Sequence, residues 1–128
     1  MNRITVSGRL VNDPVVRYTP KGKIVCSLIL AVQRDYANSE GAYEADFIPI
    51  IFFEKSAEIA GNNLSKGKKI LVDGQLKTRH YPTDSGRKYV TEIIGKKFEY
   101  MYSKENDDLS GIEIPEVDMG TVDLKRDA

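Results

Sequence analysis

The sequence predicts an all-β fold, a barrel of five strands with one short helix between the third and fourth strands. Three observations predict it. Apolar and polar residues alternate along several stretches, as from Ile24 to Val32, which is the period of a half-buried strand. Clusters of Gly, Pro, Asn and Asp separate these stretches. Only residues 56–65 carry apolar side chains at helical spacing, and a chain of 128 residues is short enough for one such barrel.

The first half of the chain reads as two strands joined through turns. A strand is expected at about residues 4–9, where apolar and polar residues alternate, and Asn12-Asp13-Pro14 ends it. After the short run 15–18, Thr19-Pro20-Lys21-Gly22 supplies turn chemistry. The second strand is expected over about 24–34, followed by a hairpin loop over 37–44.

The third strand is expected at about residues 45–53. Its odd positions include Phe47 and Phe53, and its even positions include Phe52, so neither face is polar. We therefore expect both faces to be covered. Pro49 cannot donate a ladder hydrogen bond, and we expect it at an edge or a bulge.

The remaining elements are one helix and two strands. The helix is expected over about 56–65, with Gly67 as a plausible stop. Strands are expected over 69–79 and 88–100, where the period of two returns. The order strand, strand, strand, helix, strand, strand is the connectivity of an OB-fold, a partly open Greek-key barrel.

Charge is divided unevenly along the chain. The 19 Lys and Arg balance the 19 Asp and Glu, but residues 1–102 hold 16 basic and 11 acidic side chains (16 − 11 = +5) and residues 103–128 hold 3 and 8 (3 − 8 = −5). We interpret residues 1–102 as a basic OB-fold domain and 103–128 as a mobile acidic tail that could compete with nucleic acid for the basic surface. Its few apolar residues leave a docked segment as the alternative.

Several classes of function are disfavoured. No apolar run approaches the ~18 residues that span a membrane, and the N-terminus lacks the apolar core of a signal peptide, so a cytoplasmic protein is expected. Cys26 is the one cysteine, and we expect a buried thiol. One Cys and His80 cannot build a typical zinc site. Phosphate-loop, nucleophile-elbow and zinc-protease motifs are absent, so neither an enzyme nor a cofactor is expected.

Aromatic residues next to basic ones are the feature that suggests a function. Single-stranded nucleic acids expose base faces on which aromatic rings stack, while basic residues follow the phosphates. Four aromatic residues have this setting: Tyr36, Phe47, Phe53 and Tyr81. A core position is equally expected for Phe47 and Phe53 from the pattern alone, whereas the two tyrosines lie among polar neighbours. His80 is most simply an exposed strand residue.

Long runs of the sequence resemble the bacterial single-stranded DNA-binding proteins. The resemblance rests on Gly8-Arg9-Leu10-Val11-Asn12-Asp13-Pro14 with Val15-Val16-Arg17-Tyr18-Thr19-Pro20-Lys21-Gly22, on Leu64-Ser65-Lys66-Gly67 with Val72-Asp73-Gly74-Gln75-Leu76-Lys77-Thr78-Arg79, and on Tyr89-Val90-Thr91-Glu92-Ile93. The motifs occur in order over about residues 2–100. The resemblance implies an OB-fold, a homotetramer, and sequence-tolerant binding of single-stranded DNA in replication, recombination and repair.

The resemblance also implies site residues. The family's stacking positions fall on the same four aromatic residues, Tyr36, Phe47, Phe53 and Tyr81. Its phosphate-contacting positions fall on Arg17, Lys55, Lys66, Arg79 and His80. The chain departs from the family in having no Trp, so each ring is a smaller platform.

The C-terminal residues depart further from the family pattern. They lack the acidic cluster followed by Ile-Pro-Phe through which typical members recruit replication and repair proteins, so such recruitment stays open. An ending of this kind would suit a phage or mobile-element copy. Two other functions remain as alternatives: an OB-fold module that docks proteins in a primosome-like assembly and binds DNA weakly, and a nuclease, which the lack of clustered carboxylates disfavours.

Overall fold

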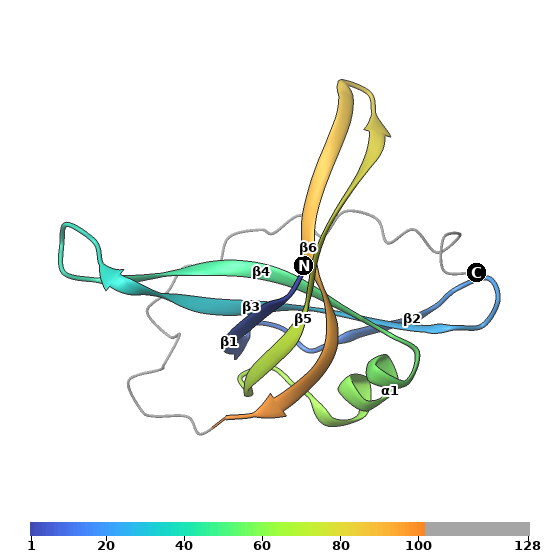
Figure 1. Cartoon of the computed structure of the whole chain (residues 1–128), viewed down its shortest axis with the longest axis horizontal. Helices are drawn as coiled ribbons and strands as arrows, with labels where there is room; N and C mark the ends of the chain where they lie inside the picture. Colours follow the sequence, from blue (N-terminus) through green and yellow to red (C-terminus); the bar gives the residue numbers. More distant parts are fainter. Residues whose placement is uncertain (102–128) are drawn as a thin grey trace.

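The computed structural model describes residues 1–101 (Figure 1). The acidic tail expected at 103–128 lies outside these residues. The elements follow the order β1 (Ile4–Leu10), β2 (Val15–Tyr18), β3 (Ile24–Ala37), β4 (Tyr43–Phe53), α1 (Glu54–Asn63), β5 (Lys69–Thr83) and β6 (Gly86–Tyr100). Within residues 1–101 the one helix lies between the third and fourth long strands, as the sequence predicts.

Five of the strands close into a barrel. The order along the sheet is β1-β5-β6-β4-β3-β2, and an additional β1–β3 pairing closes it. Two of the junctions are short. Strand β1 meets β3 only at the pairs Arg9–Ala31 and Leu10–Leu30, and β4 runs parallel to β6 only from Ile50 to Ile51. This arrangement confirms the predicted OB-fold, to which β2 adds a short edge strand paired with β3.

Two hairpins extend beyond the barrel in different directions (Figure 1). The strands are longer than the sequence pattern predicts, because these two-stranded arms continue the pairing past the last apolar residues. In the β3–β4 arm the loop expected over residues 37–44 is shortened to a turn, because Ala37 and Tyr43 pair with each other. The β5–β6 arm continues the ladder to the pair Thr83–Gly86.

The helix begins and ends earlier than expected. It starts at Glu54, directly after β4, instead of near position 56. It ends at Asn63, and Gly67 instead lies in the turn toward β5, where it takes a φ of 91° that favours glycine. The N–H of Gly67 donates to the carbonyl of Leu10 at 2.9 Å, which holds this turn against β1.

The core fills the barrel from the inner face of the strands and from the helix. On β4, Ile50 and Phe52 are fully buried in it, and Ala57 and Ala60 close it from α1. Cys26 is fully buried, as expected, and this burial raises the pKa of its thiol to about 11. The other members of the core are Leu10, Leu28, Leu30, Leu64, Ile70, Val72 and Ile93.

Pro49 lies where its missing N–H is not needed, as expected, and both faces of β4 are buried from Pro49 to Phe52. Ile51 is buried on the face opposite Ile50 and Phe52. Pro49 lies in an interior strand, paired with Ile29 in an unbroken stretch of the β3–β4 register. The proline is tolerated because pairing between β4 and β6 begins only at Ile50, so on that side position 49 lies outside the ladder.

Candidate nucleic-acid interface

The outer face of β2, β3 and β4 brings a cation and two aromatic rings together. Arg17 pairs with Val25, and Val25 pairs with Phe53, so the three side chains form one row across the sheet. Residues directly opposite each other in antiparallel strands point to the same face. Arg17 therefore lies on the same face as Phe53, separated from it by one strand.

Phe47 shares this face with Phe53. The two rings are six positions apart on β4, and strand geometry places them roughly 20 Å from each other. Both side chains are half-buried, an intermediate outcome between the core and the exposed positions that the sequence left open. Each ring is thus anchored in the sheet and keeps part of its surface available for contact.

Tyr36 lies in the β3–β4 arm. Its side chain is 68% exposed, as its polar neighbours predict. The β3–β4 register shifts between Gln33 and Ala37, so Tyr36 lies within a bulge. Tyr36 belongs to β3, which pairs with β4, the strand that carries Phe47 and Phe53.

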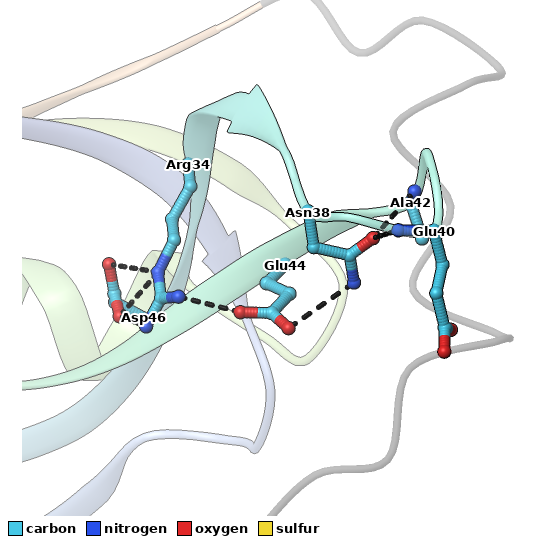
Figure 2. Close-up of polar contacts among 6 residues, drawn as sticks. All are labelled: Arg34, Asn38, Glu40, Ala42, Glu44 and Asp46. Carbon is cyan, nitrogen blue, oxygen red and sulfur yellow. Dashed lines mark hydrogen bonds and ion pairs between the residues drawn. The ribbon is translucent and has the colours of Figure 1, made fainter.

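A polar network braces this arm (Figure 2). The Arg34 guanidinium donates from Nη2 and Nε to Asp46 Oδ1, at 2.8 Å and 3.1 Å, and from Nη1 to Glu44 Oε2 at 2.6 Å. The hydrogen bond from Arg34 lowers the pKa of the Asp46 carboxyl, and the same bond raises the pKa of Arg34. The remaining oxygen of Glu44 accepts from Asn38 Nδ2 at 3.3 Å.

Tyr81 and His80 point to opposite faces of the β5–β6 arm. Tyr81 pairs with Lys88 and is half-buried, whereas His80 pairs with Tyr89 on the other face. The rings of His80 and Tyr89 contact each other with centroids 5.6 Å apart. His80 is exposed, as expected, and lies on the face opposite Tyr81 and Lys88.

Arg79 lies in a buried ion pair. Its Nε donates to Glu92 Oε1 at 2.9 Å, and the side chains are 7% and 3% exposed. The two residues come from β5 and β6 and lie on the same strands as Tyr81 and Lys88. In this arrangement Arg79 is not a surface cation, unlike Arg17.

The two remaining cations lie at opposite ends of α1. Lys55 is exposed in the first turn, two residues after Phe53. Lys66 is exposed beyond the helix end, about 15 Å away by helix rise, where its N–H donates to Asp13 Oδ1 at 2.8 Å. The strand register therefore groups Arg17 with Phe53, and Lys66 lies apart at the other end of the helix from Lys55.

Sequence reasoning missed the Arg34 network and the ring of Tyr89. Glu44 and Asp46 lie ten and twelve residues after Arg34, a spacing that acquires meaning only when the hairpin register is known. Tyr89 is 70% exposed, and its strand pattern alone gave no reason to prefer it over the other tyrosines.

Neither a metal-binding cluster nor a membrane-spanning helix is found among residues 1–101. Within that range, His, Cys, Asp and Glu side chains do not gather in threes as a metal ion would require. The helix in the same range is too short and polar to cross a membrane.

Comparisons with known proteins find single-strand binding proteins. The model of the "Single-strand binding protein family" matches residues 1–101. Single-stranded DNA-binding protein 3 of Listeria innocua is 44% identical over 107 residues, which cover 83% of this chain and 67% of the relative. The single-stranded DNA-binding protein of Bacillus cereus is 44% identical over 102 residues, and the match covers 79% of this chain but 60% of the relative's length. Single-stranded DNA-binding protein 1 of Staphylococcus aureus is 44% identical over 109 residues, 84% of this chain and 70% of the relative.

Proposed function

The chain belongs to the single-strand binding protein family, and from this premise we propose that it binds single-stranded DNA with little sequence preference. The observation that carries the proposal is the shared outer face of β2, β3 and β4. There Arg17 and Phe53 lie in one row, and Phe47 lies further along the same face. Anchored rings beside a cation are what a single strand needs, because every base has a face to stack and every linkage a phosphate.

The site combines rings from the barrel with rings from the two arms. Tyr36 and Tyr81 add platforms on the β3–β4 and β5–β6 hairpins, and Lys55 and Lys66 add exposed charges. Four stacks of ~1–3 kcal/mol each supply roughly 4–12 kcal/mol before the cost of ordering the strand. Each neutralised phosphate adds a salt dependence of about −0.7 in the slope of log K against log salt. Stacking should therefore dominate at high salt.

The role is non-catalytic in this proposal. A cavity of about 720 Å³ lies where β1, β5 and β6 meet, and its one carboxylate, Asp73, is paired with Arg3 at 3.4 Å. A lone carboxylate held by an arginine does not provide the pair of acid and base groups, or the metal ligands, that a nuclease uses. We further propose a role in replication, recombination and repair as a homotetramer, as the family resemblance implies, and a cytoplasmic location.

The test is a titration of the full chain with a fluorescein-labelled dT oligomer, followed by anisotropy at two salt concentrations. Phe53→Ala and Tyr36→Ala should each weaken binding about 5- to 150-fold, the equivalent of one stack. Tyr18→Ala is the matched control. Tyr18 is 65% exposed and adjacent to Arg17, but it points to the other face of β2 and should leave the affinity unchanged.

Two outcomes would oppose the proposal. Micromolar or weaker binding that ignores Phe53→Ala and Tyr36→Ala would favour a protein-docking OB-fold module instead. Loss of the labelled oligomer in the presence of Mg²⁺ would favour a nuclease. Light scattering with and without a dT oligomer of several tens of nucleotides would test the homotetramer and give the stoichiometry.

A further inference from the structure

The bulge that carries Tyr36 is unusually wide. Gln33 pairs with Ala45, and Ala37 pairs with Tyr43, so three residues of β3 stand opposite the single residue Glu44 of β4. Extra residues in a bulge are left out of the ladder and bend the strand. Backbone pairing therefore does not fix the direction of Tyr36, and side-chain contacts must do so if this ring is to meet a base.

Glu44 contacts Arg34, the first residue of the bulge, and Asn38, which follows the bulge (Figure 2). Its Oε2 accepts from Arg34 Nη1 at 2.6 Å, on the barrel side, and its Oε1 accepts from Asn38 Nδ2 at 3.3 Å, on the turn side. Both contacted residues are themselves held. Arg34 is held by Asp46, and Asn38 Oδ1 accepts from two backbone N–H groups of the turn, at 2.9 Å and 3.0 Å.

The net charge of the arm bears on the role of Glu44 and Asp46. Residues 34–46 contain one cation, Arg34, and four carboxylates, Asp35, Glu40, Glu44 and Asp46, so the arm has a net charge of 1 − 4 = −3. A negative arm repels phosphate. Its one cation is already engaged by two carboxylates. Attraction to DNA therefore does not explain why Glu44 and Asp46 are here, and a mechanical role does.

We propose that Glu44 is a positioning residue: by linking Arg34 to Asn38 across the bulge, it holds Tyr36 in the direction in which it stacks on a base. The proposal rests on single-stranded DNA binding as proposed above. Its energetic basis is preorganisation, since a ring fixed before binding loses less conformational entropy when the base arrives. Arg34 and Asp46 anchor the barrel side of the same clamp.

The proposal and simple electrostatics predict opposite signs for one substitution. Glu44→Gln removes a negative charge, which by itself would tighten binding to a polyanion. It also breaks the clamp, because the amide nitrogen that replaces one of the two carboxylate oxygens is a donor and cannot accept a hydrogen bond from Arg34 or from Asn38. Glu40→Gln is the matched control. It removes the same charge from the same arm, and the Glu40 side chain points away from the network (Figure 2).

Affinity for a dT oligomer provides the first readout. We expect Glu40→Gln to leave binding unchanged or slightly tighter and Glu44→Gln to weaken it about three- to tenfold, less than the loss of a whole stack in Tyr36→Ala. In a Tyr36→Ala background, Glu44→Gln should no longer weaken binding. Tightening by both substitutions, or an equal loss by Glu44→Gln whether or not Tyr36 is present, would overturn the proposal.

The second readout needs no DNA. The chain has no Trp, so Tyr36→Trp introduces a single indole at the bulge. Its steady-state anisotropy in the free protein should fall when Glu44→Gln is added and stay constant when Glu40→Gln is added. Equal anisotropy in all three proteins would overturn the clamp. Failure to bind dT would overturn the proposed function instead, so the two failures can be told apart.

Discussion

Replacing Arg79 with methionine tests whether this residue stabilises the fold or contacts phosphate. The substitution keeps much of the aliphatic length and removes the guanidinium. The Glu92 side chain, which is 3% exposed, would lose the cation whose Nε lies 2.9 Å from its Oε1. Within residues 1–101 the second oxygen of Glu92 has no hydrogen-bond partner, so the remaining charge would be poorly compensated.

The expected loss of unfolding free energy is about 3–5 kcal/mol, the usual cost of removing one partner of a buried ion pair. The geometry supports this size, because two unit charges at 2.9 Å attract by about 6 kcal/mol at an effective dielectric constant of 20. The double variant Arg79→Met with Glu92→Met should recover most of the loss. Replacing both charges with apolar groups of similar volume is often close to neutral.

Urea denaturation followed by circular dichroism measures these differences, and dT titrations at several salt concentrations provide the second assay. If Arg79 acts in the fold, the salt slope of Arg79→Met should equal that of the unmodified protein. Arg79 would instead be a phosphate contact if Arg79→Met lost less than about 1 kcal/mol of stability and its slope of log K against log salt became shallower by about 0.7.

Three further outcomes follow from the packing and the titrating groups. Gly95→Ala should cost about 1–3 kcal/mol in urea denaturation, since the added Cβ would overlap the buried Phe52 ring; an unchanged midpoint would contradict this contact. Because Arg34 lowers the pKa of Asp46, the stability from this pair is complete above the ordinary carboxyl pKa of ~3.9 and is lost as pH falls through the lowered value. An NMR titration of the Asp46 carboxyl should give the lowered pKa, and Arg34→Gln should return that pKa to the ordinary range. Cys26, with a pKa raised to about 11, should react with a maleimide at pH 8 only as fast as the protein opens. Labelling of the folded protein as fast as that of the urea-unfolded chain would show that the thiol is not buried.

The barrel was predictable because its strands carry their period in the sequence. The alternation from Ile24 to Val32 and the single helical stripe were sufficient to place the helix between the third and fourth long strands. The arms were not predictable in length. Pairing there rests on cross-strand partners such as Arg34 with Glu44, which a single strand's pattern does not contain.

The candidate site was predictable in its residue types more than in its geometry. Tyr36 was identified as exposed from its polar neighbours, and that prediction holds. Arg79 shows the limit. Its partner Glu92 lies 13 residues away on the next strand, and only the register of the β5–β6 hairpin reveals that the two charges meet in a buried position. The direction of a side chain on a two-faced arm, as for His80 and Tyr81, likewise depends on that register.

The two short junctions of the barrel bear on how the chain folds. The β3–β4 and β5–β6 hairpins join neighbours in sequence, whereas β1 meets β3 through Arg9–Ala31 and Leu10–Leu30, and β4 meets β6 through pairs such as Ile50–Ile93. Closing such long loops costs entropy before any contact offsets it. We therefore expect the hairpins to form early and the junctions to close last. Refolding should take milliseconds to seconds, the range of chains dominated by non-local strand pairing.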